Sequence, residues 1–395
     1  MTTQVNVKGE TPAQLIERTI QKAIEERASD IHFQSECDYI LVRFRIDGIL
    51  YPIEHIGKET QPQVISRLKV LSQMNIAEHQ FPQDGHFELT YQGKVYNIRV
   101  AAIPTTYGET IALRILNRED MIMKFDTIGF TQDQLSIFHT LIKNPFGIIL
   151  ITGPSGSGKT VLLYSILNIL NKPEINMVTM EDPVELEMEN IRQIQINESI
   201  GLTFSKVMRA VIRQDPNVIM VGEIRDPDTA QMTIQAALSG ILVFSTFHTF
   251  DVPSLVTRLI EMGVPRSVVA HSVTGVISTR LARKICDSCK EGHQPSNLEK
   301  QMIGKELTLY SLQRGKGCDV CHQSGYLGRV GIYEVISFDD EIRSTIMDGK
   351  PFSELLQLLQ KKSIKTLSEA AREKVLQGVT SMDEIIRVLG MPITQ

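Results

Sequence analysis

The sequence predicts an α/β fold with more than one domain, and three observations lead to this prediction. The chain has 395 residues, which is enough for two or three compact domains. Its first 117 residues contain stretches in which apolar and polar side chains alternate, a pattern typical of antiparallel strands. From about residue 131, short apolar runs alternate with helical patterns, which is typical of a parallel sheet covered by helices.

Residues 1–117 are expected to form a small α+β domain. Thr11, Pro12 and Gln14 have the pattern of a helix start, in which Thr11 is the N-cap and Gln14 its capping-box partner. This helix should end near Ser29. Three alternating stretches then predict antiparallel strands, over residues 42–46, 87–91 and 96–100.

The rest of the chain divides by composition and period into four further regions. Residues 118–130 show neither the two-residue alternation of a strand nor the helical spacing of apolar side chains, and they are expected to be a linker. The α/β domain should cover residues 131–285, a cysteine-bearing insertion residues 286–328, and a C-terminal helical region residues 329–395. In that last region the helical pattern starts at Phe338, and Thr380 and Ser381 precede the last helix as capping residues.

A glycine-rich stretch, GPSGSGKT, follows the apolar run GIILIT and precedes a helical pattern. In that setting the backbone N–H groups and the helix N-terminus bind phosphate groups. Lys159 would reach the β- and γ-phosphates and Thr160 would ligate Mg²⁺. We therefore expect a site for a nucleotide and Mg²⁺, the alternative being a chance glycine-rich turn. The loop alone does not distinguish a kinase, a helicase, a GTPase and a mechanical ATPase. The residues expected to contact the nucleotide are Gly153, Pro154, Ser155, Gly156, Ser157, Gly158, Lys159, Thr160 and Val161.

Nucleotide hydrolysis also requires acidic groups near the metal and the attacking water, and two stretches supply them. The stretch EDPVE contains Glu181 and Glu185, although a solvated acidic turn would have the same composition. Glu223 ends the apolar run VIMVG, where Gly222 stands in place of the usual aspartate. His248 follows the apolar run ILVFS and can hydrogen-bond a γ-phosphate, unless it is an ordinary core histidine.

Four of the five cysteines form two C-x-x-C pairs on either side of residues 290–317. Two such pairs supply four thiolates to one tetrahedral ion, so a structural Zn²⁺ site is predicted. A redox pair is the alternative, and His322 is a weaker candidate ligand. The expected ligands are Cys286, Cys289, Cys318 and Cys321, whereas Cys37 stands apart.

Charge and hydropathy exclude several classes of protein. A net charge of −5 argues against a dedicated nucleic-acid binder. Since the sequence has neither an apolar run long enough for a membrane span nor a signal-peptide pattern at its start, we expect a cytoplasmic protein that reaches a membrane only through a partner.

In their order along the chain, these motifs and several others resemble the secretion ATPases of type II secretion and type IV pilus assembly. The resemblance covers nearly the whole chain. The matching stretches are ASDIH (28–32), PQDGHF (82–87), PTTYGETIALRIL (104–116), GPSGSGKT (153–160), EDPVE (181–185), GLTF (201–204), RQDPNVIMVGEIRDPDTA (213–230), FHT (247–249), RLARKICDSC (280–289) and CDVCHQSGYLGRVGIYEV (318–335).

The resemblance implies a RecA-like motor domain preceded by a PAS-like α+β domain, in a hexamer driven by Mg-ATP. It makes Glu223 the second-strand glutamate near Mg²⁺ and Glu185 the residue that polarises the attacking water, with Glu181 beside it; Glu185 and Glu223 could exchange these roles. It makes His248 a γ-phosphate sensor. It also implies that Arg99 and Arg114 reach the nucleotide from the N-terminal domain, although Arg99 alone would read as a solvent-facing strand residue.

The function that follows from the resemblance is a hexameric motor at the cytoplasmic face of the inner membrane, which powers pilus assembly or type II secretion through a platform protein. A pilus retraction ATPase and a nucleic-acid motor for DNA uptake or transfer are the alternatives. The chain departs from the family pattern at two positions: His86 stands where an arginine is common, and Ile241 stands where a histidine is usual. It is also expected to be a short form that lacks the first N-terminal domain of larger relatives.

Overall fold

The computed structural model describes residues 10–117, 121–303, 311–362 and 364–390. The chain divides into two compact units, Met1–Met121 and Ile122–Gln395. Of the predicted linker, residues 118–120 lie outside the described residues, and Phe125–Ile128 forms the short helix α4. No helix of the described ranges is long and apolar enough to cross a membrane.

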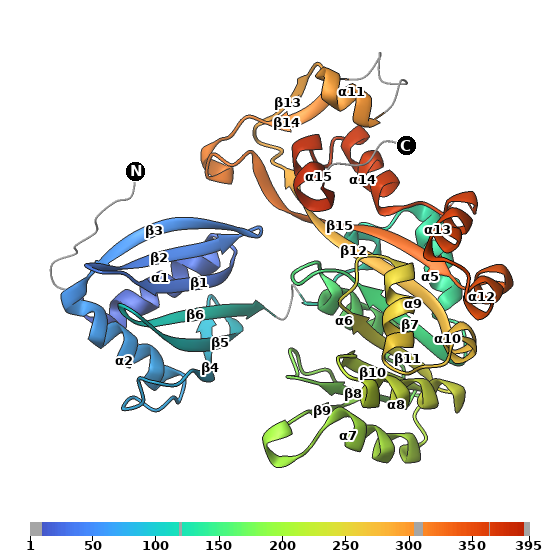
Figure 1. Cartoon of the computed structure of the whole chain (residues 1–395). Coiled ribbons are helices and arrows are strands. Elements are labelled where there is room, and N and C mark those ends of the chain that lie inside the picture. Colours follow the sequence, from blue (N-terminus) through green and yellow to red (C-terminus); the bar gives the residue numbers. More distant parts are fainter. Residues whose placement is uncertain (1–9, 118–120, 304–310, 363, 391–395) are drawn as a thin grey trace. The chain divides into compact units, whose positions relative to one another are not determined.

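The first unit is a six-stranded, fully antiparallel sheet with two helices (Figure 1). Its strand order is β3-β2-β1-β6-β5-β4. Both helices contact the sheet, α1 at β1 and α2 at β4 and β6. The elements are α1 (Pro12–Glu25), β1 (Ala28–Ser35), β2 (Tyr39–Ile46), β3 (Ile49–Gly57), α2 (Gln61–Leu71), β4 (Gln83–Tyr91), β5 (Lys94–Thr105) and β6 (Gly108–Asn117).

Helix α1 begins at the capping box that the sequence predicts. The backbone N–H of Gln14 donates to Oγ1 of Thr11, and the N–H of Thr11 donates to Oε1 of Gln14 at 3.0 Å. The helix ends at Glu25, earlier than the expected Ser29, because Arg27 has a φ of 57° and β1 begins at once. This positive φ turns the chain from the helix directly into the sheet.

The second unit is built on a seven-stranded sheet of order β15-β12-β7-β11-β10-β8-β9 (Figure 1). All neighbouring strands are parallel except β15, which is antiparallel to β12. The α/β fold predicted for this region is therefore confirmed. The strands are β7 (Gly147–Thr152), β8 (Met177–Glu181), β9 (Ile191–Gln195), β10 (Val218–Glu223), β11 (Leu242–Phe247), β12 (Val273–Ile285) and β15 (Tyr326–Ser337).

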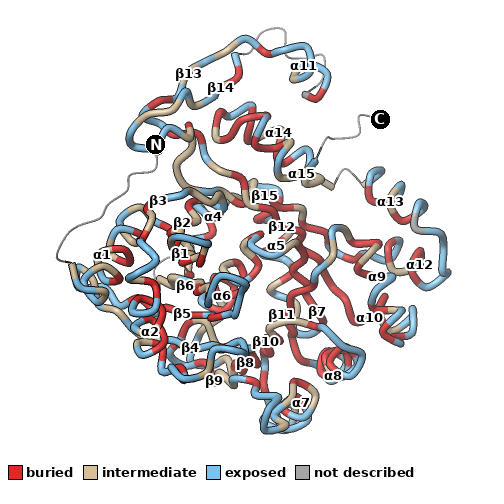
Figure 2. Tube along the Cα trace, turned by 60° about the vertical axis from the view of Figure 1, so that its left-hand side comes forward, coloured by how far each residue is buried: buried red, intermediate tan, exposed pale blue. Residues whose placement is uncertain are grey.

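Helices cover this sheet and leave its central strands buried, as Figure 2 shows for β7, β11 and β12. One continuous apolar core joins alternate strand residues such as Leu150, Val221 and Val243 to α7–α10, α12 and α13. Parallel strands buried in this way read as unbroken apolar runs in the sequence. The helices are α5 (Gln132–Leu141), α6 (Lys159–Leu170), α7 (Phe204–Val211), α8 (Pro227–Leu238), α9 (Val252–Glu261), α10 (Arg266–Ser272), α12 (Asp340–Met347) and α13 (Phe352–Lys361).

Strand β15 occupies the start of the C-terminal region predicted to be helical from residue 329, whereas the helical pattern predicted to start at Phe338 agrees with α12, which begins at Asp340. Strand β15 runs to Ser337, because Ile332, Val335 and Ile336 are buried where β15 pairs with β12. Helices follow it, and Ser381 caps the last one by accepting the N–H of Glu384 at 3.3 Å, as predicted. Residues 391–395 lie outside the described residues. The remaining elements are β13 (Lys290–His293), α11 (Asn297–Ile303), β14 (Leu312–Gly315), α14 (Leu367–Leu376) and α15 (Met382–Leu389).

Candidate active site and metal centre

The glycine-rich stretch forms a tight loop between the end of β7 and the start of α6. Gly153, Gly156 and Gly158 all have positive φ angles. A Cβ atom on Gly153 would lie 2.6 Å from Oγ of Ser157 and 2.6 Å from the carbonyl oxygen of Thr279, so only glycine fits there. The loop therefore has the strand–loop–helix setting that phosphate binding requires.

Lys159 is the first residue of α6 and lies across this loop. Its Nζ donates to the carbonyl oxygens of Gly153 at 2.8 Å and of Pro154 at 3.0 Å. Burial lowers the pKa of Lys159 to about 8, against the opposing effect of the Glu223 carboxylate. An ammonium group short of solvent and anchored only to carbonyls is suited to a phosphate anion. Thr160, the next residue, is exposed at the helix N-terminus, where its hydroxyl can reach a metal ion.

Glu223 and His248 come together at the ends of the neighbouring strands β10 and β11. Nε2 of His248 lies 3.4 Å from Oε2 of Glu223. Arg225, which the sequence reasoning did not single out, forms an ion pair with Oε1 of Glu223 and lies 3.7 Å from Oδ2 of Asp182. The hydrogen bond to Glu223 raises the pKa of Arg225. Its position two residues after Glu223 is the only sequence feature that would have connected it with the site.

Gly222, which stands where an aspartate is usual, lies beside the backbone of β8. A Cβ atom at this position would lie 3.3 Å from the carbonyl oxygen of Met180, a close but not a forbidden contact. The departure at Ile241 has a packing reason. Its side chain is buried in the core beneath α8, where an imidazole would need a polar partner.

Glu181 and Glu185 differ in their surroundings. Glu181 ends β8 and is buried, and both of its carboxylate oxygens accept hydrogen bonds from protein side chains: Tyr164 at one oxygen, Thr179 and Gln193 at the other. Glu185 is half-buried in the loop that follows, and its backbone N–H donates to the Tyr164 hydroxyl at 3.1 Å. Both carboxylate oxygens of Glu181 are thus engaged in hydrogen bonds with side chains of the protein itself.

Arg99 and Arg114 lie directly opposite each other on β5 and β6 of the first unit. Nε of Arg114 donates to Oδ1 of Asp30 at 3.0 Å. The side chain of Arg114 is 65 % exposed, so most of its guanidinium group is accessible. His86, one of the departures from the family pattern, lies opposite Arg99 on β4.

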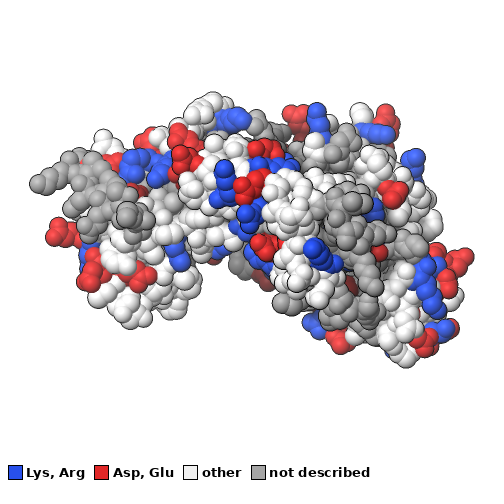
Figure 3. Space-filling model, turned by 90° about the horizontal axis from the view of Figure 1, so that it is seen from above, with Lys and Arg blue, Asp and Glu red and all other residues white. Residues whose placement is uncertain are grey.

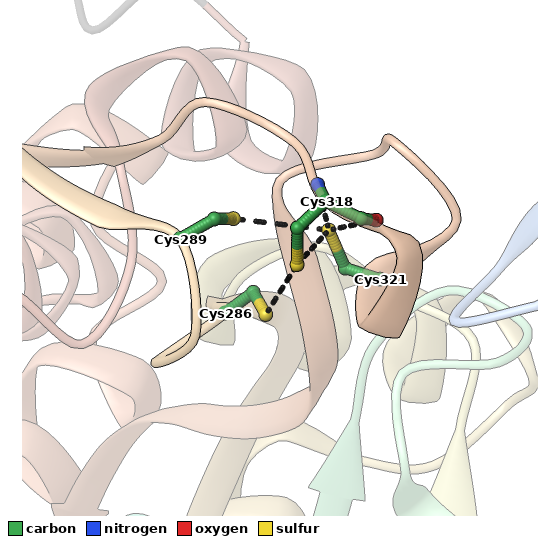
Figure 4. Close-up of side chains that lie close together, drawn as sticks. All are labelled: Cys286, Cys289, Cys318 and Cys321. Atoms are coloured by element: carbon green, nitrogen blue, oxygen red, sulfur yellow. Dashed lines mark hydrogen bonds between the residues drawn. The ribbon is translucent and has the colours of Figure 1, made fainter.

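The four cysteines predicted to bind zinc converge in space (Figure 4). Their Sγ atoms all lie within 4.8 Å of one another, with distances of 3.9 Å between Cys286 and Cys318, 3.8 Å between Cys289 and Cys321, and 3.6 Å between Cys318 and Cys321. Four sulfurs at the usual Zn–S distance in a tetrahedron are about 3.8 Å apart. The donor set and spacing therefore fit one Zn²⁺ ion.

Backbone donors favour the ionised form of Cys321. Burial opposes ionisation, but the N–H groups of Cys318 and Gly325, 3.2 and 3.3 Å from its sulfur, lower the pKa of Cys321 to about 7. Thiolates, not thiols, bind metal ions. His322 is exposed and does not belong to the cluster, so the tetracysteine set predicted from spacing is the one that converges.

Comparisons with known proteins agree with these features. A family model described as "Type II/IV secretion system protein" matches residues 7–387. The chain is 39 % identical over 375 residues to "Type II secretion system protein E" of Pseudomonas aeruginosa, covering 95 % of this chain and 74 % of that protein. It is 41 % identical over 387 residues to "Type IV pilus assembly ATPase TfpB" of Acinetobacter baylyi, covering 96 % of this chain and 65 % of that protein.

Among solved structures, the ATPase DotB of Legionella pneumophila has the same fold, with a TM-score of 0.71, 21 % identity and 97 % coverage of each chain. The family model and the curated relatives extend over almost the whole chain. The protein therefore belongs to the type II/IV secretion system protein family and is an ATPase of that family.

Proposed function

We propose that this protein is a hexameric motor that hydrolyses Mg-ATP to power type IV pilus assembly or type II secretion. It would work at the cytoplasmic face of the inner membrane, through an inner-membrane platform protein. The observation that carries this proposal is the identity of about 40 % with both a secretion protein E and a pilus assembly ATPase. A phosphate-binding loop beside the Glu223–His248 pair is the chemistry such a motor needs.

In this proposal the loop residues 153–161 hold the phosphates of ATP. Lys159 exchanges its two carbonyl partners for the β- and γ-phosphates, and Thr160 and Glu223 orient the Mg²⁺ ion, which neutralises charge on the phosphates when bound. Glu185 polarises the attacking water, and the reverse assignment of Glu185 and Glu223 is the alternative. His248, in contact with Glu223, senses whether the γ-phosphate is present.

Arg99 and Arg114, on β5 and β6 of the first unit, would also take part in hydrolysis, as the family resemblance implies. Their guanidinium groups would neutralise the charge that develops as the γ-phosphate leaves, an effect worth about 10³–10⁵ in rate where it has been measured. Hydrolysis would be coupled to movement of the domains. A Zn²⁺ ion bound to the four cysteines would hold together a small lobe whose described part consists mainly of the two-stranded sheet β13-β14 and the short helix α11.

A nucleic-acid motor is less well supported. Figure 3 shows acidic and basic side chains interspersed over the described residues of the face it draws, without a continuous basic stripe. Nucleic-acid channels need such a stripe together with stacking aromatics. The motor for pili or secretion and the nucleic-acid motor are distinguished by measuring the ATPase rate with and without single-stranded DNA. We expect the two rates to be equal.

The deciding experiment compares cells that lack this gene with cells complemented by the wild type or by Lys159→Ala. Surface filaments are counted, and an exported protein is assayed in the medium and in the cell. Cells without surface filaments would support pilus assembly, and cells with normal pili but exoprotein trapped inside would support type II secretion. In either case the Lys159→Ala protein should fail to restore the wild-type phenotype. Hyperpiliated cells would instead establish retraction, and unchanged filaments and export would contradict the proposal.

A further inference from the structure

We propose that Tyr164 and Glu181 act as a positioning pair that sets the place of Glu185 relative to the phosphate-binding loop. The inference rests on the proposed role of Glu185 in hydrolysis. Tyr164 lies on α6, five positions after Lys159, and is fully buried. Glu181 ends β8, and residues 182–190 form the loop that connects β8 to β9 and carries Glu185.

The Tyr164 hydroxyl makes three hydrogen bonds. It donates to Oε2 of Glu181 and accepts the backbone N–H groups of Glu185 at 3.1 Å and Leu186 at 3.2 Å. A phenol has one donor and two acceptor positions, so this hydroxyl is fully used. Burial and the neighbouring Glu181 carboxylate both raise the pKa of Tyr164, so the hydroxyl keeps the proton that it donates.

The second carboxylate oxygen of Glu181, Oε1, also accepts hydrogen bonds. Oε1 accepts from Oγ1 of Thr179 at 2.5 Å and from Nε2 of Gln193 at 3.2 Å. Gln193 also donates to the carbonyl of Leu186 at 2.9 Å and accepts the N–H of Met188 at 2.7 Å. The loop is thus tied on one side to α6 through Tyr164 and on the other to β9 through Gln193.

This arrangement connects two parts of the proposed site. Helix α6 begins with the residues that hold phosphates, and the Tyr164 hydroxyl on the same helix fixes the backbone of Glu185. A water-polarising carboxylate must be placed within a fraction of an ångström, and a displacement of about 1 Å can cost about 100-fold in rate. Glu181 is therefore a positioning residue that acts through Tyr164, since both of its own oxygens are already engaged.

The test is Tyr164→Phe, which removes one oxygen atom and leaves two buried N–H groups without their acceptor. We expect kcat for ATP to fall about 10- to 100-fold, while KM and the dissociation constant of a non-hydrolysable ATP analogue change by less than about threefold. Tyr326→Phe is the matched control. It loses a hydroxyl hydrogen bond to Ser381, far along the chain from the site, and should keep normal kcat.

A double-mutant cycle identifies the route of the effect. If Tyr164 acts through Glu185, single-turnover hydrolysis by Glu185→Gln should fall less than about twofold when Tyr164→Phe is added. Full additivity would overturn the inference, as would normal kcat in Tyr164→Phe. If Tyr164→Phe does not fold, kcat is measured for Glu181→Gln instead. A lowered kcat would support the inference, and a normal kcat would overturn it. Absence of hydrolysis by the wild type would instead refute the proposed function itself.

Discussion

Arg114 and Asp30 are bound to each other across neighbouring strands, with Nε of Arg114 3.0 Å from Oδ1 of Asp30. The pair belongs to a longer row. His86, Arg99, Arg114, Asp30 and Arg45 occupy paired positions on five adjacent strands, β4, β5, β6, β1 and β2. Paired positions share one face of a sheet, so a single carboxylate lies among several cationic or titratable groups.

We predict that Arg114→Ala abolishes most ATP turnover, by about 10³-fold or more, without preventing nucleotide binding. The guanidinium group is mostly exposed, so its loss should leave the fold intact. The measurement is kcat together with the affinity for a fluorescent ATP analogue. Arg67→Ala, which removes an exposed arginine of α2, is the control. Normal turnover by Arg114→Ala would remove this residue from the active site.

Lys159→Ala should abolish hydrolysis and weaken nucleotide binding. The lysine is the cation held at the centre of the phosphate-binding loop, where two carbonyl groups fix its ammonium. ATP turnover and analogue binding are measured, with circular dichroism to verify the fold. A variant that hydrolyses ATP at the wild-type rate would show that the loop does not hold the reacting phosphates.

Nucleotide affinity should fall as the pH rises through about 8. Burial lowers the pKa of Lys159 to about 8 in the free protein, and only the ammonium form attracts phosphate. A bound anion raises that pKa, so binding takes up a proton and KM should increase up to about tenfold per pH unit above the pKa. KM for ATP is measured from about pH 6.5 to about 9.5. A flat profile throughout this range would contradict the prediction.

Purified protein should contain about one zinc per chain, and Cys289→Ser should lose most of it. Metal binding in such lobes contributes on the order of 10 kcal/mol to folding, so chelation should also lower the melting temperature. Metal content is measured by mass spectrometry. Cys37→Ser is the matched control, since Cys37 is exposed and outside the cluster. Metal-free protein of unchanged stability would refute the tetracysteine site.

Local chemistry made much of this structure predictable. The capping residues Thr11 and Ser381 bind backbone groups within one helical turn, so their patterns are complete in the sequence. The same holds for the phosphate-binding loop, whose strand, glycines and helix are contiguous. The two C-x-x-C pairs could be joined because two such pairs together offer the four thiolates of a tetrahedral zinc site, whereas the redox alternative needs only one pair.

Features that depend on distant partners were missed. Strand β15 pairs with β12, about 50 residues earlier, and its short apolar alternation was absorbed into the helical region that follows. Tyr164 stands in the apolar helical run that follows the phosphate-binding loop, and the sequence pattern offers no reason to single it out. Nothing near it in sequence indicates that its hydroxyl reaches Glu181, because that contact forms only when β8 is placed beside α6.

Strand β12 has a mechanical consequence. Its 13 residues run in one piece from the core of the second unit to Ile285, immediately before Cys286. Near its middle, Oγ1 of Thr279 donates to the carbonyl of Ser157 in the phosphate-binding loop at 2.9 Å. The segment from Thr279 to Cys286 is about 23 Å long. Strand β12 therefore connects the metal lobe directly to the phosphate-binding loop, so a displacement of the lobe along the strand would be felt at Ser157.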